Sequence, residues 1–531
     1  MFTIPGGDYE HGGAASSGLK DMLKKVGVEP AALRRAMIAA YEAEMNVVIH
    51  SSHGGEMQVA LDDGVLDVEV SDTGPGIPDV ELAMKEGFST APAKARELGF
   101  GAGMGLPNIR RSSDRFSIES AAGQGTRLRF TIYLTPQAAV ERAAGSLEVV
   151  AERCRECLRC LHVCPTRALR VRGGRPEVME HLCIECGACI GACEAGALAM
   201  KGVAEMPRQA AGTLLVVPPA FLVQFGPRVG PRAVLSALAE LGFGEVWVTE
   251  GWEAALEEAV VRYAREEAGA WPVISPACPA VVSLIEMRFP SLIGHLAPFA
   301  SPVGAAQSEA AGRDALVVAA CPAQRSVLAA LRGRTSEVVG PRGLWQAILR
   351  RVAEGGESAS ERAGEPGRAE GVLRVTGVRH VVAALEEAEN GRLGDVAVLE
   401  LFACDRGCFG SPAWREEPFV AAWRWRRMGG RPLLAMGARL PAMGALARAG
   451  QAVRRKEAFA PRAGLRLDED MARAIAKLAE MDRLIRELPG RDCGRCGAPT
   501  CSALAEDVVL GRAAVTACPF CGGAGSEEKR P

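Results

Sequence analysis

The chain has 531 residues, which is too long for one hydrophobic core and predicts three or four domains. Its composition, 48% hydrophobic and 24% charged, is that of a globular protein, and the formal net charge of −2 argues against nucleic-acid or anionic-membrane binding. The N-terminus has no basic segment followed by an apolar run, and the apolar stretch 213–226 is too short to span a bilayer. We therefore expect a cytoplasmic protein without a membrane partner, whose 17 cysteines bind metal rather than form disulfides.

Residues 1–135 have the pattern of one α/β domain, with helical patterns on both sides of Pro30 and strand-like alternation at 66–72 and 126–134. Three short motifs occur in it, each of which could alone be an ordinary turn or helix face. Their residues are Glu42 and Asn46 on one helix face, Asp72 at a strand end with Gly74 and Gly76 in the next turn, and Gly101, Gly103 and Gly105 at the start of a helix suited to phosphate. Thr126 begins the last strand.

In this order the motifs resemble the GHKL ATP-binding fold, and in particular the small anti-sigma-factor serine kinases. The resemblance implies that Asn46 holds Mg²⁺, Glu42 acts as general base and Asp72 binds the adenine amino group. The glycines of 101–105 would then form a phosphate lid. No segment resembles the phosphoacceptor helix of a sensor kinase, and we interpret His50 as a structural residue.

Residues 148–203 carry two cysteine runs with the spacing of bacterial two-cluster ferredoxins. Three thiolates of a run bind one 4Fe-4S cubane and the fourth crosses to the other. The expected sets are Cys154, Cys157, Cys160 and Cys193 on one cluster, and Cys183, Cys186, Cys189 and Cys164 on the second. The alternative is a pair of zinc sites, but zinc needs only four ligands and favours separated pairs of cysteines. Two adjacent clusters predict an electron conduit.

Residues 210–447 alternate short apolar strand patterns with helical ones, which indicates parallel α/β structure interrupted by a polar insertion at 352–371. Four scattered cysteines, Cys278, Cys321, Cys404 and Cys408, follow strand-like runs and are expected to face a common crevice. A lone cysteine is otherwise a small buried apolar residue.

The order of these four cysteines after a ferredoxin module resembles the iron-iron hydrogenases, whose H-cluster joins a 4Fe-4S cubane to a di-iron site. The resemblance implies that Cys278, Cys321 and Cys404 hold the cubane and that Cys408 bridges it to the di-iron unit. Ala277 stands where active members have a proton-relaying cysteine, Gln324 replaces a lysine, and the third loop reads CFGSP rather than a glycine run. These departures resemble the divergent, sensory branch and predict slow hydrogen turnover. A cubane alone, or neither group, are the alternatives.

The C-terminal residues 475–531 hold Cys493, Cys496, Cys501 and Cys518, which resemble a small 4Fe-4S domain of multi-cluster redox proteins. The alternative is a zinc ribbon in which Cys521 replaces Cys501. Iron explains Cys501 and is the reading that we favour.

The predicted fold class is therefore multidomain α/β and α+β: a GHKL sandwich, a two-cluster ferredoxin fold, a hydrogenase large-subunit-like α/β domain and a small C-terminal Fe-S domain. The expected cofactors are 4Fe-4S clusters, a di-iron subsite and Mg-ATP. The expected partners are a redox protein, such as ferredoxin or a hydrogenase subunit, and a protein phosphorylation target. Three functions remain open: a sensor that reports hydrogen or redox state, a catalytic or electron-transferring hydrogenase subunit, and an electron carrier without gas chemistry.

Overall fold

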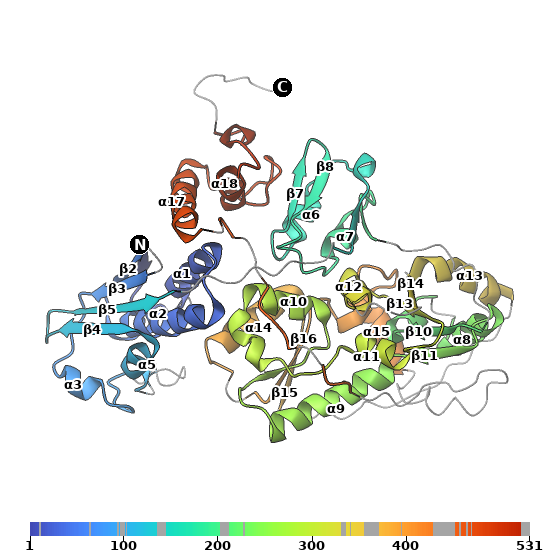
Figure 1. Cartoon of the computed structure of the whole chain (residues 1–531), viewed down its shortest axis with the longest axis horizontal. Helices are drawn as coiled ribbons and strands as arrows, with labels where there is room; N and C mark the ends of the chain where they lie inside the picture. The colour runs from blue at the N-terminus through green and yellow to red at the C-terminus, as the bar shows by residue number, and fades with distance from the viewer. Residues whose placement is uncertain are drawn as a thin grey trace. The chain divides into compact units, whose positions relative to one another are not determined.

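The structure is a computed structural model (Figure 1). The chain divides into two compact units. One comprises residues 1–141, 461–492 and 500–531, and the other 142–460 and 493–499. The structure describes residues 1–9, 12–62, 65–92, 95, 101, 103–134, 145–201, 212–226, 229–330, 336–339, 341–354, 371–393, 396–427, 452–455, 458–462, 466–468 and 470–521.

The N-terminal part of the first unit is a sheet covered by helices. Its strands, in the antiparallel order β1-β2-β3-β5-β4, are β1 (Phe2–Ile4), β2 (Gly55–Asp62), β3 (Val65–Asp72), β5 (Thr126–Tyr133) and β4 (Arg115–Ser120). The helices are α1 (Ala14–Lys25), α2 (Pro30–His50), α3 (Val80–Ala83) and α5 (Gly105–Ser112). Alternate residues of β3, Leu66, Val68 and Val70, are buried, and α2 packs on β3 and β5. The predicted α/β sandwich is confirmed.

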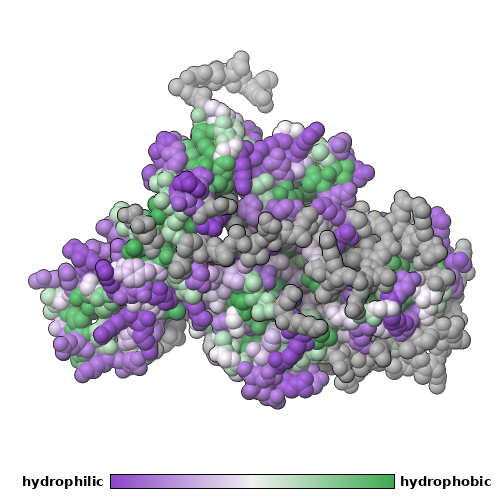
Figure 2. Space-filling model, viewed as in Figure 1, coloured by the Kyte–Doolittle hydropathy of each residue, from purple (hydrophilic) through white to green (hydrophobic). Residues whose placement is uncertain are grey.

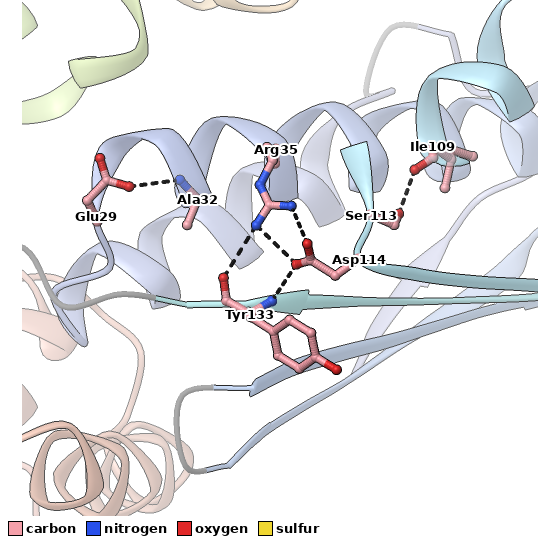
Figure 3. A network of polar contacts seen from close by, with 7 residues as sticks. All are labelled: Glu29, Ala32, Arg35, Ile109, Ser113, Asp114 and Tyr133. Atoms are coloured by element: carbon pink, nitrogen blue, oxygen red, sulfur yellow. Dashed lines mark hydrogen bonds and ion pairs between the residues drawn. The ribbon is translucent and has the colours of Figure 1, made fainter. Parts of the chain in front are cut away.

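The residues around the start of α2 explain where this helix begins and what holds it against the sheet. Pro30 occupies its first turn, and the Glu29 carboxylate accepts a hydrogen bond from Ala32 N (3.2 Å). Arg35 then makes two hydrogen bonds to the Asp114 carboxylate (2.8 and 3.0 Å), which also accepts from Tyr133 N (2.8 Å) (Figure 3). This network ties α2 to the start of β4 and the end of β5.

A buried carboxylate on α2 replaces a local cap for α1. Gly13 precedes α1 and provides no side-chain cap. Glu44, which is 2% exposed, accepts hydrogen bonds from Gly13 N (3.1 Å), Ala15 N (3.0 Å) and Ser16 N (2.8 Å). The charge lies at the positive end of the helix dipole, where an anion is stabilised.

The same unit contains the C-terminal helices α17 (Met471–Glu487) and α18 (Cys501–Val509), followed by the turn η5 (Val515–Ala517). Asp470 caps α17 through Arg473 N (2.9 Å). The buried face of α17, which includes Leu478, Met481 and Leu484, packs on α18, α1 and β2.

The second unit begins with a module of two antiparallel strand pairs and two short helices. Its elements are β6 (Leu147–Val149) paired with β9 (Leu198–Met200), β7 (Leu169–Arg172) paired with β8 (Arg175–Val178), η1 (Ala151–Arg153), α6 (Arg159–Val163) and α7 (Ala188–Ala192). Each cysteine run leads into one of the helices, which pack on each other.

The remainder of the second unit contains two parallel sheets, as the alternating pattern predicts. The order β11-β10-β13-β14 joins β11 (Glu245–Val248), β10 (Leu214–Val217), β13 (Ala315–Val318) and β14 (Ser336–Val339). The order β12-β16-β15 joins β12 (Val273–Ile274), β16 (Val398–Phe402) and β15 (Val372–Thr376). β10 and β13 are buried along their whole length, as expected of parallel strands covered on both faces.

Helices and short turns surround these two sheets. They are η2 (Pro219–Val223), α8 (Pro231–Glu240), α9 (Glu250–Glu266), α10 (Pro279–Arg288), η3 (Pro290–His295), α11 (Pro302–Glu309), α12 (Pro322–Ala330), α13 (Pro341–Glu354), α14 (Val378–Glu389), η4 (Gly407–Gly410) and α15 (Pro418–Arg427). Most of the predicted insertion 352–371, from residue 355 to residue 370, lies outside the described residues. No helix within the described ranges has the length and apolar character needed to cross a bilayer. Figure 2 shows hydrophilic side chains over much of the visible surface.

Candidate redox and nucleotide sites

The eight cysteines of the N-terminal module of the second unit line two separate cavities. One cavity is lined by Cys154, Cys157, Cys160 and Cys193, and the other by Cys164, Cys183, Cys186 and Cys189. Each set takes three cysteines from one run and the fourth from the other. The structure therefore brings together the same two sets that the spacing predicts.

The backbone around these sulfurs is arranged in the same way in both runs. Ala168 N lies 3.2 Å from Cys164 Sγ, and Ala197 N lies 3.2 Å from Cys193 Sγ, four residues after the cysteine in each case. Backbone N–H groups that donate to sulfur stabilise the negative charge of a thiolate-bound cluster.

Burial is the main influence on the pKa of four of these thiols, those of Cys160, Cys183, Cys186 and Cys189. It raises the pKa of Cys160 to about 11 and the pKa of Cys183 and of Cys186 to about 12, with neighbouring cysteines adding to the shift. A thiolate in such surroundings needs a compensating cation, and iron supplies it. The donor set and its burial thus fit iron–sulfur clusters.

The four cysteines of the hydrogenase-like region all follow carboxyl ends of parallel strands. Cys278 is the N-cap of α10 after β12, and Cys321 lies between β13 and α12. Cys404 follows β16, and Cys408 is in η4. Strands of both sheets therefore contribute, as is typical of sites at the ends of parallel strands.

These four thiols lie within electrostatic reach of one another. Burial raises the pKa of Cys404 well above its ordinary value, and the next contributions come from Cys321, Cys278 and Cys408. Burial likewise raises the pKa of Cys408 and of Cys278, and raises that of Cys321 to about 12. The set fits a cubane for the same reason as the ferredoxin-like sets.

The positions that depart from the hydrogenase pattern surround this set. Gln324 on α12 directs Nε2 toward Cys408 Sγ (3.8 Å), while its Oε1 accepts from Ala320 N (2.9 Å). In the third loop Trp414 Nε1 donates to Cys408 O (2.7 Å). Ala277 packs against the apolar cluster that includes residues of α9. A neutral amide and a methyl group thus replace the lysine and the thiol.

Two acidic residues of α9 were not found by sequence analysis. Glu253 carries a negative charge that raises the pKa of Cys408, after the larger effect of burial. Its Oε1 accepts a hydrogen bond from Thr249 Oγ1 (2.8 Å). Burial, then the charge of Glu253, raises the pKa of Glu250 to about 7. Glu250 can therefore hold a proton near neutral pH.

The nucleotide motifs of the first unit meet where α5 begins. A Cβ atom built on Gly105 would lie 3.2 Å from Asn46 Oδ1 and 3.3 Å from Glu42 Oε2, so both side chains face the first turn of α5. Glu42 Oε1 accepts a hydrogen bond from Asn108 Nδ2 (2.7 Å), a contact that the sequence did not suggest. Asn46 Nδ2 is buried and has no hydrogen-bond partner in the described part of the chain. The unsatisfied N–H group of this amide, beside a helix N-terminus, fits a phosphate oxygen as its acceptor, and the amide Oδ1 is an oxygen of the kind that binds Mg²⁺.

The adenine-side motif is also assembled. Asp72 ends β3 opposite Thr126 of β5, and its Oδ1 accepts from Gly74 N (2.7 Å). Burial raises the pKa of Asp72, against the effect of this hydrogen bond. Gly76 has φ 69°, and a Cβ there would lie 2.0 Å from Ala121 O, so only glycine fits.

The glycine segment that was expected to cover the phosphates is only partly described. Gly101 and Gly103 have φ of 88° and 72°, and α5 begins at Gly105. Residues 96–100 and 102 lie outside the described ranges.

The C-terminal cysteines are divided between the two units. In the first unit, Cys501 begins α18, and Cys521 lies close to Cys518: desolvation, then a hydrogen bond with Cys518, raises the pKa of Cys521. In the second unit, Gly497 O accepts from Val171 N of β7 (2.9 Å) in the loop that carries Cys493 and Cys496. Among the described residues no group of three or more His, Cys, Asp or Glu side chains is compact enough for a single metal ion.

Four family models match the chain. They describe a histidine kinase-, DNA gyrase B- and HSP90-like ATPase (residues 33–136), a 4Fe-4S dicluster domain (146–194), the C-terminal domain of the iron-only hydrogenase large subunit (212–313) and an Fe-S domain (488–520). The hydrogenase match includes Cys278 but ends before Cys321. The last match ends before Cys521, the extra cysteine of the zinc alternative.

Curated relatives match the nucleotide domain. The serine/threonine-protein kinase RsbT of Bacillus subtilis (strain 168) is 35% identical over 114 residues, which cover 21% of this chain and 79% of that protein. An anti-sigma F factor of Caldanaerobacter subterraneus subsp. tengcongensis is 35% identical over 100 residues, which cover 18% of this chain and 66% of that protein.

Solved [FeFe]-hydrogenases also align with the chain, at low similarity. The structure of HydA(deltaEFG), which concerns H-cluster assembly, has a TM-score of 0.33 and 15% identity, and covers 41% of this chain and 84% of that one. A variant of HydA1 from Chlamydomonas reinhardtii has a TM-score of 0.33 and 14% identity. Its match covers 45% of this chain and 87% of that one. The chain therefore belongs, through residues 33–136, to the histidine kinase-, DNA gyrase B- and HSP90-like ATPases as a relative of anti-sigma-factor kinases, and it fuses this domain to ferredoxin-like, iron-only-hydrogenase-like and C-terminal Fe-S domains.

Proposed function

We propose that the protein is a redox or hydrogen sensor in which a hydrogenase-type centre controls an ATP-dependent signalling domain. The single observation that carries the proposal is a contact inside the first unit. The Lys25 ammonium, in the last turn of α1, lies 3.0 Å from the Glu506 carboxylate on the cysteine-bearing helix α18. A helix of the Fe-S domain is thus ion-paired to a helix of the nucleotide domain.

This contact is suited to transmit a change because it is partly buried. The side chains of Lys25 and Glu506 are 20% and 14% exposed, so the ion pair is screened less than a surface pair. Lys25 O also accepts from Leu467 N (3.0 Å). α18 starts at Cys501, so binding of a cluster at this cysteine would bear on the position of Glu506, five residues further along.

The opposite end of α1 is held by the nucleotide-site helix. Glu44 on α2 accepts from three backbone N–H groups around the start of α1, and Glu42 and Asn46 lie on the same helix. A shift of α1 would therefore act on the helix that carries the expected base and metal ligand. Coupling between two sites requires such an element with contacts to both.

The proposed cofactors follow from the assembled side chains. Two 4Fe-4S clusters occupy the two ferredoxin-like sets, and a third occupies Cys493, Cys496, Cys501 and Cys518. A cubane binds Cys278, Cys321 and Cys404, with Cys408 joining it to a di-iron unit. The expected electron partner is a redox protein such as ferredoxin or a hydrogenase subunit.

In the nucleotide domain, Mg-ATP binds with Asn46 on the metal and Asp72 on the adenine amino group. Glu42, held by Asn108, accepts the proton of an attacking hydroxyl group. The output is phosphoryl transfer to a protein target, in keeping with the resemblance to a serine/threonine-protein kinase.

A catalytic hydrogenase subunit is the second candidate, and the acid pair of α9 favours it. After the larger effect of burial, the charge of Glu253 raises the pKa of Cys408. Burial raises the pKa of Glu250, one helical turn earlier, to about 7, so Glu250 can hold a proton near neutral pH. Ala277 argues against fast catalysis, because a methyl group relays no proton.

The variant Ala277→Cys distinguishes the two candidates. Hydrogen evolution is measured with a strong artificial reductant, on protein made with the hydrogenase maturation machinery, at matched di-iron occupancy from the infrared CO and cyanide bands. We expect slow evolution by the wild type and a rise of up to ~10²–10⁴-fold in Ala277→Cys. Cys408→Ser should lose the infrared bands. Fast evolution by the wild type would refute the sensory proposal.

A further inference from the structure

Glu185 lies at the junction between the second ferredoxin-like cysteine set and the hydrogenase-like region. It stands between the ligand-type residues Cys183 and Cys186, and it is 2% exposed. Its Oε1 accepts hydrogen bonds from Ser146 N (2.7 Å) and from Ser326 Oγ (2.8 Å) of α12. The buried carboxylate therefore joins the ferredoxin-like module to the helix that follows Cys321.

The backbone and the preceding side chain strengthen this junction. Glu185 O accepts from Ala323 N (3.1 Å), and the backbone of Glu185 has φ 57°, a conformation that non-glycine residues adopt at some energetic cost. Ile184 is buried in the same apolar cluster as Ala323, against which Cys278 and Cys321 pack. The two serine hydroxyls also hydrogen-bond to each other, with 2.6 Å between their Oγ atoms, so the carboxylate belongs to a connected polar network across the junction.

Glu185 lies against expected cluster ligands on both sides of the junction. Its backbone N–H lies 3.4 Å from Cys183 Sγ, and its carbonyl oxygen accepts from Ala323 N, two residues after Cys321. Cys186 and Cys321 both pack against the apolar cluster that contains Ile184 and Ala323, so the two cysteine sets are themselves close. An anion fixed between two clusters disfavours an added electron on either one.

We propose that Glu185 is a positioning residue for electron transfer, which fixes the second ferredoxin-type cluster against the Cys321 cubane and lowers the reduction potentials of both. The inference rests on the proposed clusters. In this role Glu185 keeps the distance between the two clusters constant. Because it lowers both reduction potentials, the two clusters pass electrons readily to the next acceptor.

The chain supplies a matched control in the first cysteine run. Glu156 occupies the equivalent place between Cys154 and Cys157, with a similar φ of 49°, but its side chain is exposed. A charge in that position is screened by water and should affect its cluster little. Ser326→Ala is the second control, because it removes the hydrogen bonds of Ser326 to Glu185 and to Ser146 but keeps the carboxylate.

The test is an EPR-monitored redox titration of the full chain with its clusters, after iron and sulfide analysis. In Glu185→Gln we expect two cluster transitions to move to more positive potentials, with none moving comparably in Glu156→Gln and no positive shift in Ser326→Ala. Full cluster content with unchanged potentials in Glu185→Gln would overturn the role of Glu185 alone. Equal positive shifts in Glu185→Gln and Ser326→Ala would also overturn it, since a loss of packing would then suffice. Wild-type protein that takes up no clusters in these sets would overturn the cluster assignment and this inference together.

Discussion

Replacing Glu44 by alanine should loosen α1 selectively. The substitution leaves three buried backbone N–H groups, those of Gly13, Ala15 and Ser16, without an acceptor. At roughly 1 kcal/mol for each net hydrogen bond, the loss is about 3 kcal/mol. Local opening of α1 should then become about 10²-fold more frequent.

Hydrogen exchange of the full chain, followed by mass spectrometry of peptides from 14–25, measures this opening directly. Glu29→Ala is the control, because the Glu29 carboxylate makes one partly buried cap bond at the start of α2 and its loss should cost about 1 kcal/mol. Equal protection of α1 in the wild type and in Glu44→Ala would refute the reasoning, as would an effect no larger than that of Glu29→Ala on α2.

Three further predictions concern the nucleotide, the metal and an acidic residue. Asn46→Ala should abolish Mg-ATP binding in isothermal titration of the full chain, and an unchanged affinity would contradict the assignment of the metal ligand. Anaerobically reconstituted protein should contain about sixteen irons, plus two with the di-iron unit, whereas stoichiometric zinc with about twelve irons would favour the C-terminal zinc ribbon. The pKa of Glu250 is raised from 4.5 to about 7, so its charged form destabilises the fold, and stability is lost as pH rises from about 4.5 to 7. Glu250→Gln should therefore protect α9 from hydrogen exchange at pH 8, by about 1 kcal/mol after allowance for solvent exposure, and should have no such effect near pH 4; equal gains at both pH values would contradict it.

The sequence predicted those helices and strands whose own residues favour the structure that they adopt in the fold. Pro30 marks the start of α2, and the apolar runs at 214–217 and 315–318 form buried parallel strands. The regular cysteine spacing also predicted the two sets of four. In that pattern the fourth cysteine of each run joins the first three cysteines of the other run.

The residues that sequence analysis missed owe their roles to contacts made far along the chain. Glu44 looks like an ordinary polar residue of α2, and only the fold places it at the start of α1. Glu253 has the spacing of an exposed helix face, and Asn108 sits within a motif already explained by its glycines. Glu185 and Glu156 cannot be told apart by local sequence, yet only Glu185 is buried.

The central claim is that the redox centre controls the nucleotide domain, and the Mg-ATP affinity of the cluster-loaded chain under hydrogen and under argon tests it most directly. We predict that the affinity differs by about five-fold or more between the two gases. The difference should disappear in Cys408→Ser, which lacks the attachment for the di-iron unit, and in Glu506→Gln, which breaks the ion pair to Lys25. It should persist in Glu480→Gln, which breaks only an exposed pair with Arg483 within α17. The same affinity under both gases, in wild-type protein with a full complement of clusters and di-iron bands, would contradict the account.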